Sequence, residues 1–276
     1  MSRLRTLALA GAAIFMTLPA GAADLPPIIQ RPPPPLPEEP FGGWYLRGDI
    51  GFSNQDVREV TFVGANGVTP SQQTLNKGFD SAGIFGLGLG YKFNSWVRAD
   101  VTGEYRASAN YRGLNLVANP GGINPGGNIP ENDFGSKSEW VVMANVYADL
   151  GTWWCLTPFV GAGVGMANVR LNNFQDISGV GFQNAQNYGT ATSQWNFAWA
   201  VHAGISYQVT PGLSIELAYR YLDLGDAEVA MYQSYPVAGT FAGTNQFKHI
   251  YSNDIKLGVR WMLMPEPPAY PLVRKG

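Results

Sequence analysis

The chain has 276 residues, of which 14% are charged and 13% aromatic, and its formal net charge is −2. This balance gives no reason to expect nucleic acid as a partner, and no stretch after the N-terminal leader is apolar for 18 residues, as a membrane-crossing helix would need. The single cysteine, Cys155, excludes an internal disulfide and a cysteine-based metal cluster.

Residues 1–23 have the pattern of a secretory signal peptide. Arg3 and Arg5 precede an apolar core, Leu7–Leu18, and the small residues Ala20–Ala23 offer a cleavage site. The core is too short to span a bilayer comfortably. We therefore expect export. Residues 24–42 are rich in proline and are expected to form an extended periplasmic spacer.

After this spacer, several segments show strict alternation of apolar and polar residues. In the stretch that starts at Leu213, apolar side chains alternate with polar ones such as Glu216 and Arg220, as in a strand with one apolar and one polar face. About ten such residues, tilted by about 40°, cross the roughly 25 Å apolar band of an outer membrane. Eight segments show this pattern: Trp44–Ser53, Gly83–Phe93, Trp96–Ala107, Glu139–Leu150, Thr157–Val169, Asn196–Val209, the stretch from Leu213, and Ser252–Leu263.

The gaps between these strands are alternately short and long. Asn94-Ser95, the segment around Trp153 and Trp154, and Thr210-Pro211-Gly212 are short enough for tight turns. Four long segments are expected to be polar loops: Asn54–Ser81, Ser108–Ser138, Arg170–Trp195 and Asp223–Tyr251. An even strand number with alternating turn lengths predicts an all-β fold, an eight-stranded antiparallel up-and-down transmembrane barrel over residues 43–264.

A soluble eight-stranded barrel is the rival architecture, and it would bury the apolar face. Two observations favour the membrane form: no charged residue falls on the apolar face of any predicted strand, and aromatic residues collect at both ends of that face, as two membrane–water interfaces favour. The girdle expected at the short-turn end is Trp44, Phe93, Trp153, Trp154 and Trp261, and the girdle at the long-loop end is Tyr105, Trp140, Trp199, Tyr221 and Tyr251.

The polar face of these strands would line a narrow lumen, where charges should pair because an unpaired buried charge is costly. The expected cations and anions balance, which favours a plugged interior over an ion-selective channel. The predicted network comprises Arg47, Asp49, Lys92, Arg98, Asp100, Glu104, Arg106, Glu139, Asp149, Glu216, Arg220, Asp254, Lys256 and Arg260.

Signals for an enzyme or a cofactor are weak. Gly86-Leu-Gly88-Leu-Gly90 lies inside a predicted strand and lacks the spacing of a dinucleotide-binding turn, so these glycines are expected to leave lumen space for long side chains. Two histidines, His202 and His249, are too few for a histidine-rich metal site. A pairing of His249 with Ser252 has no fixed carboxylate to orient the histidine. We expect no catalytic residue, metal or cofactor.

Several motifs resemble the OmpA-like, opacity-type surface-antigen family of Gram-negative bacteria. They are Ala22–Pro26, Gly43–Gly51, Glu216–Asp226 and Ile255–Trp261. The resemblance implies an outer-membrane barrel with roles in envelope integrity, surface antigenicity and, in some members, adhesion. It also implies outer-membrane lipid, lipopolysaccharide and the barrel-assembly machinery as partners. The chain departs from the family at its end, where Leu263 replaces a terminal aromatic and a tail, residues 265–276, follows.

The resulting hypothesis is a monomeric structural barrel, a surface antigen that binds host or surface ligands through its loops. Two alternatives remain: a small diffusion pore, in which Arg98→Glu would change ion selectivity, and an outer-membrane lipid hydrolase, in which His249→Ala would abolish lipid turnover.

Overall fold

The computed structural model describes residues 42–118, 127–178, 186–235 and 238–263. The signal peptide, nearly all of the proline-rich spacer and the C-terminal tail lie outside the described residues, so they stay predictions. No helix in the described part of the chain is long and apolar enough to cross a membrane.

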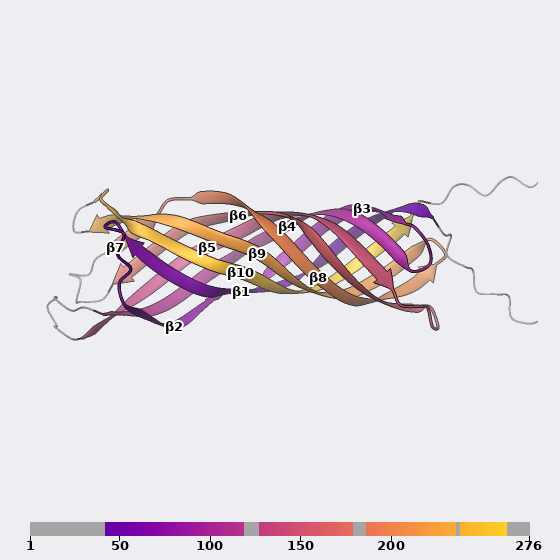
Figure 1. Cartoon of the computed structure of the whole chain (residues 1–276), viewed down its shortest axis with the longest axis horizontal. Helices are drawn as coiled ribbons and strands as arrows, with labels where there is room; N and C mark the ends of the chain where they lie inside the picture. The colour runs from indigo at the N-terminus through magenta and orange to yellow at the C-terminus, as the bar shows by residue number, and fades with distance from the viewer. Residues whose placement is uncertain (1–41, 119–126, 179–185, 236–237, 264–276) are drawn as a thin grey trace, which may run out of the picture. The chain divides into compact units, whose positions relative to one another are not determined.

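The described chain forms one closed antiparallel β-barrel with eight strand positions around the ring (Figure 1). Hydrogen-bonded pairing runs around the ring from β1 through β3, β4, β5, β6, β8, β9 and β10 and returns to β1. Two short strands extend these positions. β2 continues the position of β3 and pairs with β4, and β7 continues the position of β8 and pairs with β6 and β9. The bounds are β1 Gly43–Gly64, β2 Gln72–Phe79, β3 Ala82–Lys92, β4 Val97–Ala118, β5 Asn128–Asp149, β6 Leu156–Ser178, β7 Gln186–Gly189, β8 Thr192–Thr210, β9 Leu213–Tyr235 and β10 Phe241–Met262.

The strands extend much further than the alternation alone predicts. β1, β4, β5 and β10 have 22 residues each. Such a strand, rising about 3.3 Å per residue at a tilt of about 40°, reaches roughly 55 Å along the barrel axis, about twice the thickness of an outer-membrane apolar band. The four segments predicted to be long loops are therefore largely paired strands, and the prediction of loops over their whole length is wrong.

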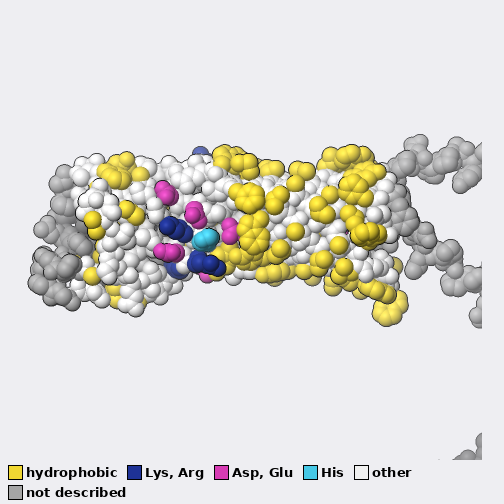
Figure 2. Space-filling view, viewed as in Figure 1, with side chains coloured by type: hydrophobic (Ala, Val, Ile, Leu, Met, Phe, Trp, Pro, Cys, Tyr) yellow, Lys and Arg dark blue, Asp and Glu magenta, His cyan; other side chains and the backbone are white. Residues whose placement is uncertain are grey.

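The outer surface changes character along the barrel. On the half that carries the short turns, apolar side chains such as Phe52 and Leu87 face outward, with 73% and 75% of their surface exposed. Figure 2 shows this apolar belt on the right and a paler, more polar surface on the left, with charged side chains gathered beside the belt. An exposed apolar belt of this extent is expected where lipid, not water, is the solvent.

The interior changes in the opposite direction. Inside the belt many of the inward side chains are charged, but in the extension the inward positions carry apolar residues such as Val57, Val60, Leu171, Val229 and Met231, all buried. The extension thus has a hydrophobic core of the kind found in soluble β-proteins, because its outer face meets water. The period-two pattern continues, but the apolar set moves from the outer to the inner face.

Candidate functional site

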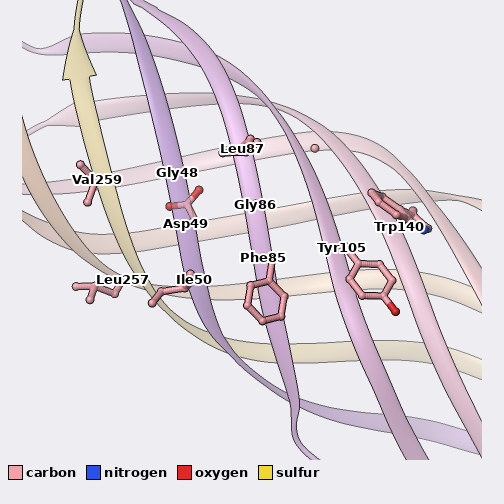
Figure 3. A pocket seen from close by; sticks show the side chains of 11 residues that line it. Gly48, Asp49, Ile50, Phe85, Gly86, Leu87, Tyr105, Trp140, Leu257 and Val259 are labelled. Carbon is pink, nitrogen blue, oxygen red and sulfur yellow. The ribbon is translucent and has the colours of Figure 1, made fainter.

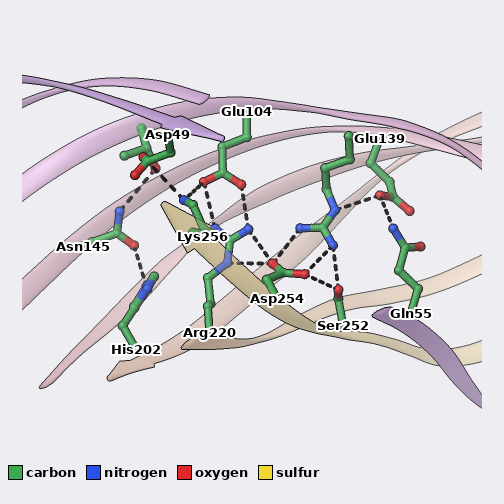
Figure 4. A network of polar contacts seen from close by, with 12 residues as sticks. Asp49, Gln55, Glu104, Glu139, Asn145, His202, Arg220, Ser252, Asp254 and Lys256 are labelled. Carbon is green, nitrogen blue, oxygen red and sulfur yellow. Dashed lines mark hydrogen bonds and ion pairs between the residues drawn. The ribbon is translucent and has the colours of Figure 1, made fainter. Parts of the chain in front are cut away.

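The predicted lumen charges all lie on the inner face and are buried. At their centre, Arg220 reaches across the lumen from β9 to β4, where its two terminal nitrogens lie 2.9 and 2.6 Å from the carboxylate oxygens of Glu104. Arg220 Nη2 also lies 2.7 Å from Asp254, and Lys256 Nζ lies 2.5 Å from Glu104 (Figure 4). Each charge therefore has more than one partner, which compensates for its loss of water.

A second group lies nearer the short turns. Arg47 binds Asp100 at 2.7 Å and Asp49 at 2.8 Å, and it donates to the Tyr147 hydroxyl at 3.1 Å. Asn145 donates to the second oxygen of Asp100 at 2.8 Å. These contacts connect β1, β4 and β5 through the barrel interior.

A third group completes this end. Arg98 lies 3.1 Å from Asp149 and 3.3 Å from Glu216, and its guanidinium stacks 4.3 Å from the centre of the Tyr147 ring. Arg260 Nε donates to Glu216 at 3.0 Å. Lys92 is buried in the same half of the barrel.

Arg106 lies near the end of the network that is farther from the short turns. It binds Asp254 at 2.8 Å and Glu139 at 3.0 Å and donates to Ser252 at 2.6 Å. Lys137, which the sequence analysis did not predict, lies 2.5 Å from Glu139 with its ammonium 4.3 Å from the centre of the Phe79 ring. Lys137 was missed because it falls in a segment predicted to be a loop.

Three aromatic rings lie directly above this charged region. Tyr111, Phe174 and Phe247 are buried, with centroid separations of 5.1 to 5.7 Å. They come from β4, β6 and β10, so they meet across the barrel interior. The charged region and the aromatic core thus fill successive levels of the lumen.

The strand glycines have the spatial role expected from the sequence. A Cβ atom on Gly88 would lie 2.9 Å from the Arg47 side chain, and one on Gly90 would overlap the Tyr45 ring. Close inward packing of large side chains therefore requires glycine at these positions.

The two histidines lie in different environments. His202 is buried and its Nε2 lies 3.2 Å from the Asn145 side-chain oxygen. His249 is exposed on the outer surface with a positive φ of 51°, and its backbone nitrogen donates to Asp226 at 2.8 Å. Ser252 faces the lumen, bound to Arg106 and Asp254. The barrel wall separates His249 from Ser252, so the two do not form a catalytic pair.

The predicted girdle residues lie on the outer surface. Trp44, Phe93, Trp153, Trp154, Trp261, Tyr105, Trp140 and Trp199 are exposed, and Tyr221 and Tyr251 are partly exposed. Tyr105 and Trp140 pack together on neighbouring strands, with ring centroids 5.0 Å apart. They border a shallow apolar hollow that includes Phe85 and Leu87 (Figure 3). Trp96 and Trp195, which the girdle prediction omitted, are also exposed.

An acidic cluster lies at the far end of the extension. Asp133 on β5 and Asp176 on β6 are direct register partners, and Glu131 lies two residues from Asp133. Burial and the neighbouring carboxylates raise the pKa of Glu131 to about 8 and the pKa of Asp133 to about 7. This cluster was not expected from the sequence because the acids lie in predicted loops, although the alternation of Glu131 with Asp133 was a visible signal.

No group of three His, Cys, Asp or Glu side chains in the described ranges is arranged to hold a metal ion. Cys155 is partly buried in the turn before β6.

Comparisons with known proteins agree with this architecture. An uncharacterised protein of Brucella abortus is 36% identical over 74% of this chain and 75% of its own length. The outer membrane protein PagN of Salmonella typhimurium is 27% identical over 79% of this chain and 89% of its own length. A protein of Rickettsia conorii described as a candidate adhesin is 29% identical over 66% of this chain and 68% of its own.

A solved structure and a family model complete the comparison. The outer membrane protein OprG of Pseudomonas aeruginosa has the same fold, with a TM-score of 0.52 at 13% identity over 82% of this chain and 99% of OprG. The model of the outer membrane protein β-barrel domain matches residues 9–262. The chain therefore belongs to the outer membrane protein β-barrel domain family, and it is an outer-membrane protein.

Proposed function

We propose that the protein is a sealed, non-enzymatic barrel that presents its long extracellular β-extension as a binding surface for host or environmental ligands. In this proposal the signal peptide exports the chain, the assembly machinery inserts it, and lipopolysaccharide surrounds the outward aromatic residues. The observation that carries the proposal is the filling of the lumen at two successive levels.

The two levels differ in chemistry, which supports a seal over a pore. A hydrated ion would first have to displace the ion pairs around Arg220 and Glu104. It would then meet the rings of Tyr111, Phe174 and Phe247, which offer no carboxylate or carbonyl to replace its water shell. A diffusion pore is therefore the less favoured alternative.

The height of the extension supports a role in binding. The strands continue well above the upper girdle, and the extension has its own hydrophobic core, so its tips stand on a rigid support. The candidate adhesins among the relatives make adhesion the reasonable first activity to test. A lipid hydrolase is disfavoured because His249 and Ser252 lie on opposite sides of the wall.

The test is a gain of binding on a non-adherent Gram-negative strain that expresses the chain. We expect cells displaying the folded barrel to bind cultured epithelial cells or immobilised matrix proteins several-fold better than cells carrying an empty vector. A variant in which residues 65–71, the tip between β1 and β2, are replaced by a glycine-serine sequence of equal length reports on that tip. A matched control changes only the short turn at Asn94 and Ser95, which should leave binding unchanged.

Conductance measurements test the seal separately. We expect the purified barrel to be silent in a planar bilayer, with folding confirmed in the same sample. Steady openings, altered in selectivity by Arg98→Glu, would show a pore. Surface display of a folded barrel without any gain of binding would contradict the adhesive role.

A further inference from the structure

A pocket of about 530 Å³ opens at the extracellular end of the barrel. Its walls include the apolar side chains of Phe62, Val117 and Phe241, and its polar lining includes Glu131 and Asp176. Apolar walls around a carboxylate group are unusual on a surface, because each carboxylate loses part of its hydration there.

The acidic cluster is built from two cross-strand pairs of β5 and β6, which are separated by one intervening pair. Asp176 is the partner of Asp133 in one pair, and Ser178 is the partner of Glu131 in the other. Directly opposed like charges destabilise a sheet. Asp133 and Asp176 are 5% and 7% exposed, so water screens their repulsion poorly.

No positive charge compensates this cluster among the described residues. The hydrogen bonds that reach the three carboxylates come from neutral side chains: Asn115 donates to Asp133, Asn187 to Asp176, and Ser178 to Glu131. The segments between the described ranges, residues 119–126, 179–185 and 236–237, contain no lysine, arginine or histidine in the sequence. Among the described residues and these segments no side chain supplies a cation to this cluster, so a proton or an external ligand would neutralise the pocket.

The unsatisfied atoms in this region indicate the chemistry of such a ligand. Asp176 Oδ1 and Asn115 Oδ1 are buried and have no hydrogen-bond partner among the described residues, and the Asn187 side-chain oxygen shares this state. Asp176 and Asn115 are 7% and 4% exposed. All three atoms are acceptors, and Asp176 and Asn187 line the pocket, so a ligand that donates hydrogen bonds would satisfy their free oxygens.

We propose that this pocket binds an alkylammonium or alkylguanidinium group, the end of a lysine or arginine side chain or of a free polyamine. The apolar walls suit the aliphatic stem of such a ligand, and the carboxylates with the free amide oxygens suit its N–H donors. A bare metal ion fits less well, because no three acidic side chains in the described part of the chain converge on one point. The inference rests on the proposed use of this end of the barrel for binding.

The experiment is calorimetric titration of the folded full barrel in detergent micelles at pH 7.5. The cationic probes are cadaverine, spermidine, agmatine and Nα-acetyl-lysine methylamide. Nα-acetyl-norleucine methylamide is the uncharged analogue, and calcium chloride supplies the metal ion. The test variant is Glu131→Gln with Asp176→Asn, and the matched control is Glu59→Gln, an exposed acid on the same extension. Circular dichroism spectra and electrophoretic mobility establish that both variants fold.

We expect the cationic probes to bind, the norleucine analogue not to bind, and the double variant to lose at least tenfold in affinity while Glu59→Gln is unchanged. Binding should also release protons, detected as a dependence of the heat on buffer ionisation, because a bound cation favours the charged carboxylates. Binding of the lysine derivative identifies a peptide side chain as the source, and binding of the polyamines alone identifies a free polyamine.

Absence of binding by every cationic probe, equal binding by the double variant, or binding of calcium alone would overturn the proposal. Because the titration needs no cellular partner, failure here leaves the cell-binding result standing. Failure of the cell assay likewise leaves the titration interpretable.

Discussion

Arg220 and Glu104, which are 116 residues apart in the chain, form a two-point ion pair across the middle of the barrel, with nitrogen–oxygen distances of 2.9 and 2.6 Å. Neither side chain is more than 1% exposed. This pair connects strands β4 and β9, which are not neighbours in the sheet. The pair joins two strands that face each other across the lumen, which backbone hydrogen bonds between neighbouring strands cannot do.

Removing one member of this pair should be strongly destabilising. Glu104→Ala leaves Arg220 and Lys256 without a major partner, and breaking a buried ion pair costs about 3–5 kcal/mol. The measurement is urea-induced unfolding of the barrel in lipid vesicles. Glu59→Ala, at an exposed site, should change the free energy of unfolding by no more than about 0.5 kcal/mol. Equal effects of the two substitutions would show that the lumen network contributes little.

The aromatic core of the extension should be equally sensitive. Phe174→Ala removes a buried ring that packs 5.1 Å from Phe247 and 5.7 Å from Tyr111, and such a change costs about 3–5 kcal/mol. We expect lower unfolding stability but no steady conductance, since the ion pairs below still fill the lumen. Stable openings in this variant alone would show that the aromatic level is the sole barrier.

Two glycines provide a matched pair of substitutions. Gly90→Ala should destabilise the barrel by about 1–3 kcal/mol because the new methyl group displaces the Tyr45 ring, whose hydroxyl donates to Asp100 at 3.1 Å. Gly103→Ala should be nearly neutral, because no atom lies within 4 Å of its added Cβ. Thermal unfolding of both variants checks this, and a destabilised Gly103→Ala with an unaffected Gly90→Ala would contradict it.

The acidic cluster predicts a pH dependence at the extracellular end. The pKa of Glu131, about 8, and that of Asp133, about 7, exceed the ordinary values of 4.5 and 3.8. A group whose pKa is higher in the folded state holds its proton more tightly there, so its contribution is complete below the ordinary pKa and is lost as the pH rises through the folded value. The extension should therefore be more stable at pH 5 than at pH 8.5.

Hydrogen exchange of the β5 and β6 amides measures this effect locally. Opening free energies should fall between pH 5 and pH 8.5 in the wild type, after correction for the intrinsic exchange rate. The variant Asp133→Asn with Asp176→Asn should show a flatter profile. An equally steep profile in that variant would place the titrating groups elsewhere.

The sequence by itself determined the membrane part of the barrel. In that half each side chain faces either lipid on the outside or the confined lumen on the inside. Side-chain polarity therefore alternates from residue to residue, which identifies both the strands and the face to which each residue belongs. The sequence alone therefore places Arg98, Glu216 and Arg260 on the inner face of their strands, although it does not identify their partners.

Only the tertiary structure decided the extension and its contents. Above the membrane the solvent outside becomes water, so the apolar side chains move to the inner face, and segments that contain many polar residues look like loops when read alone. The placement of Lys137 beside Glu139, the stacking of Phe174 on Phe247, and the opposition of Asp133 to Asp176 all depend on how distant strands align. Alternation fixes the face of each strand, but closure of the barrel fixes which side chains meet across it.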